Sequence, residues 1–124
     1  MKSGNIIQEK SYAFAIRIVN LYKFLCEQKK EFVLSKQMLR SGTAIGANIE
    51  EGIEGQSEKD FFAKLNIAYK EARETHYWLR LLKDTGYLSE SESKSMIDDC
   101  DDILKIMASI IKTVKTKLNL IPNF

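Results

Sequence analysis

Residues 41–52 read SGTAIGANIEEG, a stretch that combines three glycines with two isoleucines. Ile45 and Ile49 are four residues apart, a spacing that places apolar side chains on one face of a helix. A phosphate-binding loop does not fit, because the glycine spacing differs and no strand precedes the segment. Inside a helix, Gly42 and Gly46 each cost about 1 kcal/mol relative to alanine. We therefore predict a helix whose glycines allow another backbone to approach closely.

Two polar residues, Asn48 and Glu51, lie beside this predicted seam, the close contact between the glycines and the neighbouring backbone. A polar group next to a tightly packed apolar seam needs a hydrogen-bond partner. We expect these side chains to make buried hydrogen bonds, with Glu71 or Glu74 of the following helix as partners.

Apolar residues recur at steps of three and four along most of the chain. The pattern predicts four helices, at residues 5–29, 35–54, 58–85 and 90–119. The connections between them are about three to five residues long, which forces consecutive helices to be antiparallel. The predicted fold is therefore all-α, an antiparallel up-down four-helix bundle, with residues 1–124 forming a single domain.

Local signals mark the predicted helix ends. Three serines precede helices and are expected to act as N-caps: Ser35, Ser57 and Ser89. Asp60 and Glu92 follow the second and third of these serines by three residues, as in a capping box. Two glycines are the predicted helix stops: Gly55, and Gly86 in a left-handed conformation.

The helix predicted at residues 90–119 carries more apolar surface than one core face needs. Its main row is Ile97, Cys100, Leu104, Met107, Ile111, Val114, Leu118 and Ile121. A second row consists of Met96, Ile103, Ile106 and Ile110, and the preceding helix adds Ile67, Trp78 and Leu81. These extra residues indicate either a wide face toward the core or a surface for self-association.

Composition excludes several classes of protein. The chain has 19 basic and 17 acidic side chains, which is too balanced to indicate nucleic-acid binding by itself. The N-terminal segment is interrupted by charges, so it resembles neither a signal peptide nor a membrane span. Cys26 and Cys100 are expected to be free thiols, and the expected location is the cytoplasm.

Catalytic and metal sites find little support in the sequence. The chain has one histidine, His76, and no nucleophile at a spacing that indicates a catalytic pair with it. Glu71 and Glu74 share a helix face, but the Glu-x-x-His motif of bundle metal sites is missing. The acidic run at residues 98–102 is expected to be a solvated face. We predict no catalytic residue, no metal and no cofactor.

A basic and aromatic stripe follows the helix predicted at residues 58–85. The side chains expected to contact nucleic acid are Lys70, Arg73, Tyr77, Arg80 and Lys83. Arginine can meet phosphates and tyrosine can stack on bases. The last helix is polarised, with four lysines and no acid in residues 103–124. The alternative is that these charges serve solubility and complement helix dipoles.

Several segments, in order, resemble the 23S rRNA-intervening sequence proteins. The matching residues are Asn48, Ile49, Glu51, Gly52, Ser57, Phe61, Glu74, Trp78, Leu79, Gly86, Tyr87 and Leu88. The resemblance covers nearly the whole chain and is strongest from Leu39 to Leu88. This chain has Glu50 where many members have alanine, which places an additional carboxylate beside the motif.

This resemblance implies a four-helix bundle that assembles as a ring-like homopentamer, without catalytic residues to carry over. A related retroelement accessory protein forms such a barrel and binds nucleic acid and a reverse transcriptase. The expected partners are therefore further copies of the chain and RNA or a ribonucleoprotein, with no membrane. The alternative is a module that binds another protein and no nucleic acid.

Overall fold

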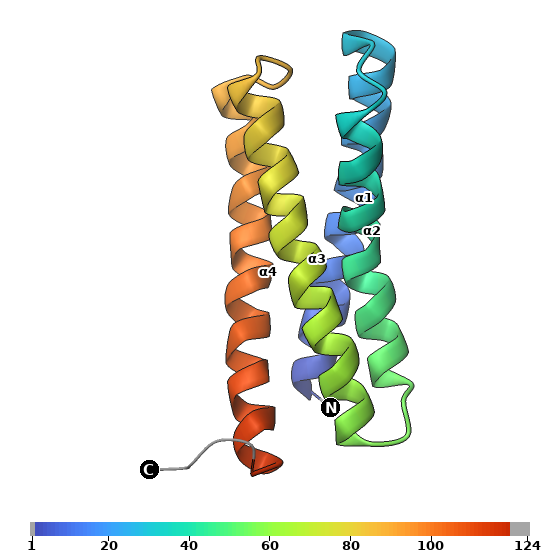
Figure 1. The fold of residues 1–124 in the computed structure, drawn as a ribbon, viewed down its shortest axis with the longest axis vertical. Coiled ribbons are helices and arrows are strands. Elements are labelled where there is room, and N and C mark those ends of the chain that lie inside the picture. The colour runs from blue at the N-terminus through green and yellow to red at the C-terminus, as the bar shows by residue number, and fades with distance from the viewer. Residues whose placement is uncertain (1, 120–124) are drawn as a thin grey trace.

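A computed structural model describes residues 2–119 as four long helices (Figure 1). The helices are α1 (Lys2–Lys29), α2 (Leu34–Ile53), α3 (Glu58–Asp84) and α4 (Glu90–Lys117). Each helix runs antiparallel to the one before it, so the predicted all-α antiparallel four-helix bundle is confirmed. The helix boundaries lie within three residues of those predicted from the sequence.

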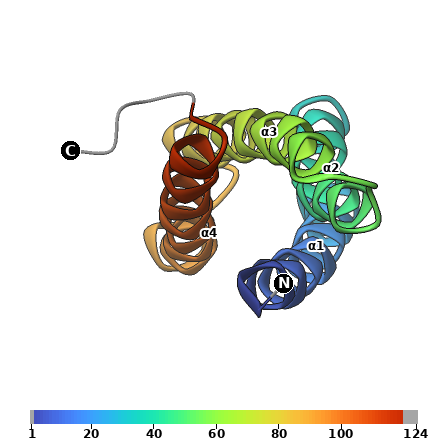
Figure 2. The same ribbon diagram turned by 90° about the horizontal axis from the view of Figure 1, so that it is seen from below.

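The helices follow one another in chain order around an arc when the bundle is seen along its length (Figure 2). Packing is most extensive between α2 and α3 and least extensive between α1 and α4. The seam between α1 and α4 includes polar contacts. Arg17 pairs with Asp99, and its guanidinium also donates to Ser95 Oγ at 2.8 Å. The first and last helices are thus joined partly by exposed hydrogen bonds.

The core consists of side chains at the predicted helical spacing. Its largest members from α1 to α3 are Ile7, Phe14, Ile18, Leu25, Met38, Ile45, Ile49, Leu65, Leu79 and Leu82. Ser11 and Thr75, the polar residues inside two of these stripes, are buried with them. Among the side chains of residues 6–119, every buried nitrogen and oxygen has a hydrogen-bond partner.

Both apolar rows of α4 face the bundle. Met96, Ile103 and Ile110 from the second row are buried, whereas Ile97 and Leu104 from the main row are half-buried. The reason is that α4 packs against both α3 and α1, which requires a wide apolar face. Of the two interpretations, the wide core face therefore describes α4. The predicted main row also includes Ile121, which lies outside the described residues.

Two of the three predicted N-caps are confirmed. Ser57 accepts a hydrogen bond from the backbone N–H of Asp60 at 3.1 Å. Ser89 and Glu92 form a reciprocal capping box. Gly86 has φ of 86°, the left-handed conformation expected after α3. These motifs are local in sequence, which explains why sequence alone was sufficient to find them.

The prediction for the start of α2 was wrong. Ser35 is buried inside the helix, and no side chain at the N-cap position accepts a hydrogen bond. The carboxylate of Glu31 caps the helix instead. It accepts hydrogen bonds from the backbone N–H of Leu34 at 2.8 Å and from that of Ser35 at 2.7 Å. Burial raises the pKa of Glu31, but the hydrogen bonds from Ser35, Leu34 and Val33 outweigh it and lower the pKa overall. At the other end, α2 stops at Ile53, two residues before the predicted Gly55.

Candidate nucleic-acid interface

The small residues of SGTAIGANIEEG lie where α2 meets α1. Gly42 and Gly46 are both buried. A Cβ atom on Gly42 would lie 2.8 Å from the side chain of Ile18. A Cβ atom on Gly46 would lie 3.3 Å from Ser11 Oγ and 3.4 Å from the backbone oxygen of Ser11. The predicted close approach is confirmed, and α1 is the helix that makes it.

The opposite flank of the same segment packs on α3. A Cβ atom on Gly52 would lie 3.0 Å from Lys64 Cβ and 3.3 Å from the ring of Phe61. The hydroxyl of Thr75 donates to Ser41 Oγ at 2.8 Å, and both residues are buried. SGTAIGANIEEG therefore contacts a neighbouring helix on each side, which accounts for its small residues.

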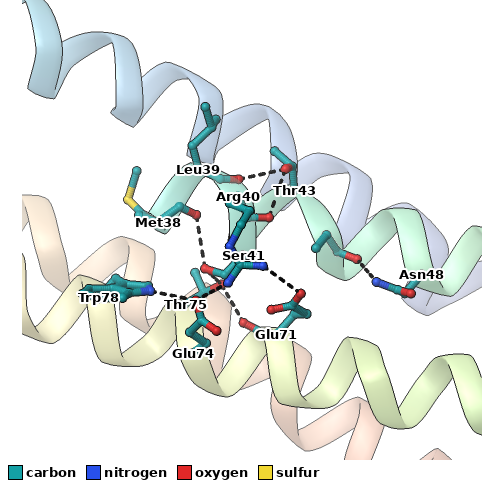
Figure 3. A network of polar contacts seen from close by, with 11 residues as sticks. Met38, Leu39, Arg40, Ser41, Thr43, Asn48, Glu71, Glu74, Thr75 and Trp78 are labelled. Atoms are coloured by element: carbon teal, nitrogen blue, oxygen red, sulfur yellow. Dashed lines mark hydrogen bonds and ion pairs between the residues drawn. The ribbon is translucent and has the colours of Figure 1, made fainter. Parts of the chain in front are cut away.

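An ion-pair network covers the outer edge of the α2–α3 contact (Figure 3). Arg40 of α2 pairs with Glu74 and, at 3.2 Å, with Glu71. The indole of Trp78 donates to the same Glu74 carboxylate at 3.0 Å. The hydrogen bond from Trp78 is the main cause that lowers the pKa of Glu74, with Arg40 contributing. Glu74 and Trp78 of the sequence motif thus serve as parts of one structural contact.

Two predicted hydrogen-bond residues do not reach this network. Asn48 Nδ2 donates to Ala44 O of its own helix at 2.9 Å. Glu51 is exposed and pairs with Lys64 at 2.9 Å. Antiparallel packing places Glu51 level with Lys64, and the carboxylates of Glu71 and Glu74 lie further along α3. The prediction that Asn48 and Glu51 bond to those carboxylates was therefore wrong.

The basic and aromatic stripe lies on the outside of α3. Lys70, Arg73, Tyr77 and Arg80 are exposed, and Lys83 is half-buried, with its Nζ 3.8 Å from Asp84. The guanidinium of Arg80 lies over the ring of Tyr77, 5.9 Å from its centroid. Tyr77 in turn meets Trp78 edge-on at 5.1 Å between ring centroids. Four of the five side chains predicted to contact nucleic acid are thus exposed to solvent.

Charges are sorted across the width of α3. Glu71 and Glu74 face α2, where both pair with Arg40. Lys70, Arg73 and Arg80 take part in no ion pair with any residue of the described range 2–119. The free positive charges of α3 are therefore separated from its acids.

The single histidine and the buried cysteine both contact groups of a neighbouring helix. His76 Nε2 lies 3.0 Å from Asp101 Oδ1 of α4. The thiol of Cys100 is buried and donates to Ala72 O at 3.3 Å, and this burial raises its pKa to about 12. Among the side chains of the described residues, no three His, Cys, Asp or Glu groups are placed to hold a metal ion. No described helix is long and apolar enough to cross a membrane.

Two features of the surface were not predicted from the sequence. One is Arg40, which joins two acids that lie about thirty residues away. The other is an exposed apolar row on α1, formed by Tyr12, Ile16 and the half-buried Val19. These three residues have helical spacing of their own, which was a usable signal. The longer core stripe of the same helix is the stronger pattern and obscures it.

Comparison with known proteins agrees with this architecture. The model of the 23S rRNA-intervening sequence protein family matches residues 4–109. A crystal structure of a protein of unknown function from the S23 ribosomal protein family of Bacteroides thetaiotaomicron is similar to this chain. Its identity is 55% and its TM-score 0.86, over 89% of this chain and 98% of that chain. No curated protein matches. The chain belongs to the 23S rRNA-intervening sequence protein family.

Proposed function

We propose that this protein is a non-enzymatic, cytoplasmic helical scaffold that assembles with itself and associates with RNA or a ribonucleoprotein. The RNA part of this proposal rests on the separation of acidic from basic side chains across α3. Arg40 holds Glu71 and Glu74 on one flank, which leaves Lys70, Arg73 and Arg80 without acidic partners in residues 2–119. Exposed cations beside tyrosine rings are the combination that binds a phosphate backbone and unstacked bases.

The assembly part of the proposal rests on exposed apolar side chains. Tyr12 is 61% exposed and Ile16 49% exposed on α1, and Ile67 is 44% exposed on α3. Apolar patches on a protein surface often mark interfaces. We propose a homopentamer, in which repetition of the α3 stripe around a ring would multiply a modest positive patch.

Filter binding against a structured RNA tests the first part. The wild-type protein should bind with an affinity that falls steeply as salt rises, because each phosphate contact releases counterions. Changing Lys70, Arg73 and Arg80 together to glutamine should flatten the salt dependence by roughly 0.7–0.9 in log–log slope for each phosphate that is no longer bound. The matched control changes three exposed lysines around the α1–α2 connection, Lys23, Lys30 and Lys36, to glutamine. Equal losses in the two triple variants would show that net charge alone explains the binding.

Light scattering tests the second part. The wild-type protein should have a mass near five subunits at micromolar concentration. Ile16→Asp should yield smaller species that remain helical by circular dichroism, because a charge would be buried in the interface. A wild-type monomer under these conditions would refute the assembly.

A second candidate is a module that binds another protein and no nucleic acid. The apolar α1 row favours it, as do the exposed Phe32 and Val33 in the α1–α2 connection. Affinity purification with and without nuclease separates the two candidates. A partner that survives nuclease and is lost in Tyr12→Asp would favour the protein module, and one released by nuclease would favour RNA.

A further inference from the structure

A groove of about 340 Å³ lies between α3 and α4. Its lining comes from both helices: Asn66, Tyr69, Ala108, Ile111, Lys112 and Lys115. Two contacts between α3 and α4 flank it along the bundle. His76 meets Asp101 at 3.0 Å on one side. On the other side, Lys117 meets Glu58 at 2.8 Å. The groove is thus a bounded site and not the whole length of the helix pair.

The charges at the rim of this groove have one sign. Lys112 and Lys115 line it from α4, and α4 has no acid from Ile103 onward. Arg73 follows Tyr69 by four residues, so it lies one turn further along the same face of α3. One member of the predicted α3 stripe, Arg73, therefore lies one turn beyond a groove that two lysines of α4 line.

The floor of the groove is apolar and its shape is held by the core. Tyr69 is half-buried and packs against core residues, and Ala108 and Ile111 complete the apolar lining. Asn66 adds a polar group whose Nδ2 atom is fixed by a 2.8 Å hydrogen bond to Phe62 O. No residue whose side chain is described, residues 6–119, donates to Asn66 Oδ1, so this atom is available as an acceptor.

We propose that this groove holds one unstacked base of single-stranded RNA against Tyr69. The neighbouring phosphates lie on Lys112, Lys115 and Arg73, and Asn66 Oδ1 accepts from an amino group of the base. A volume of about 340 Å³ is at the small end of ligand pockets, which suits a single base. Aromatic stacking with a basic rim is how proteins hold single strands. The inference rests on the proposed RNA association and specifies where a base is bound.

Two other hollows suit this ligand less well. The one between α1 and α4 has Glu92 in its lining, and its Arg17 is already paired with Asp99. The one at the α2–α3 turn is lined by Glu58 and has no basic side chain. The α1–α4 hollow also holds a basic side chain and an aromatic ring, Arg17 and Phe24, but its Arg17 is paired with Asp99, whereas no acid of the described residues lines the groove of Tyr69 beside Lys112 and Lys115.

Fluorescence anisotropy with labelled single-stranded RNA tests the proposal in two ways. The first compares an intact oligonucleotide with one that carries abasic sites but the same phosphates. The second compares the wild-type protein with Tyr69→Leu, which keeps an apolar side chain in the core. Each change should weaken binding about tenfold while the salt dependence stays the same. Tyr87→Leu, at a tyrosine in the α3–α4 connection that is likewise half-buried and packs against the core, is the matched control and should bind as the wild type does.

Lysine variants test the rim. Changing Lys112 and Lys115 to glutamine should lower the slope of log affinity against log salt by about 0.7 for each phosphate that is no longer bound. If the wild type binds no RNA, the RNA part of the proposed function fails, and the base site fails with it. If it binds intact and abasic RNA equally, and Tyr69→Leu has no effect, the base site is wrong while RNA association stands. Competition by adenosine monophosphate as strong as by the oligonucleotide would also overturn the proposal, since the ligand would then be a free nucleotide.

Discussion

The packing of Gly46 against α1 makes a quantitative prediction. Its Cβ would lie 3.3–3.5 Å from three atoms of Ser11, two of which belong to the backbone. The backbone of Ser11, inside a long helix, cannot move aside as a flexible side chain can, but its two atoms would lie at ordinary van der Waals distance from an added Cβ. Gly46→Ala therefore requires only the Ser11 hydroxyl at 3.3 Å to shift by a few tenths of an ångström, and this strain about offsets the roughly 1 kcal/mol gain in helix propensity. We expect the free energy of unfolding to change little.

Gly46→Leu places three further carbons into the same contact. Overpacking costs about 1–3 kcal/mol, and the immobile backbone of Ser11 indicates the upper end of that range. After subtracting the propensity gain of roughly 1 kcal/mol, we expect a net loss of about 2 kcal/mol. For a chain of this length, that loss corresponds to a fall in Tm of roughly 6–10 °C.

Thermal and urea unfolding, followed by circular dichroism at one protomer concentration, would measure these changes. Ala47→Leu is the matched control, because Ala47 is the next residue of α2 and is exposed. It should unfold within about 0.5 kcal/mol of the wild type. If Gly46→Leu proves as stable as Ala47→Leu, close packing is not the reason for a glycine at this position.

Three further predictions concern polar groups. Glu31→Gln should cost about 1 kcal/mol at pH 7 by weakening the cap on α2. Because the pKa of Glu31 is lowered by folding, its contribution is present above the ordinary glutamate pKa and lost as the pH falls through the lowered value. Urea midpoints of variant and wild type should therefore converge in acid, and a constant difference would contradict the cap. Thr75→Val should cost about 1 kcal/mol in urea unfolding because the hydrogen bond to Ser41 is removed, and a neutral result would contradict this. A thiol reagent at pH 8 should modify Cys26 in the folded protein but not Cys100, whose pKa is about 12; equal rates would show that Cys100 is accessible.

Features encoded by neighbouring residues were predictable from the sequence. The caps at Ser57 and Ser89 depend on partners three residues away, and the sequence shows them directly. The cap on α2 was missed because its acceptor, Glu31, belongs to the preceding connection. Buried Ser35 was the more familiar candidate by residue type, but three backbone donors converge on the carboxylate of Glu31.

Features that depend on the register between helices could not be predicted. Arg40 meets Glu71 and Glu74 only because α2 and α3 pack with one particular axial offset. The same offset takes Glu51 to Lys64, contrary to the sequence-based expectation. The groove at Tyr69 likewise exists because α4 brings its lysines beside α3. Periodicity specifies which face of a helix is buried, but not which residue of the neighbour stands opposite.

The contact between α1 and α4 also has a consequence for folding kinetics. It joins residues about eighty positions apart, such as Arg17 and Asp99, whereas every other helix contact follows a short turn. Closing a longer loop costs more chain entropy, and the packing between α1 and α4 that would offset this cost is the least extensive of the four helix pairs in contact. We therefore expect α1 and α4 to join last as the chain folds. Backbone amides along that seam should show the weakest protection from hydrogen exchange within the helical interior.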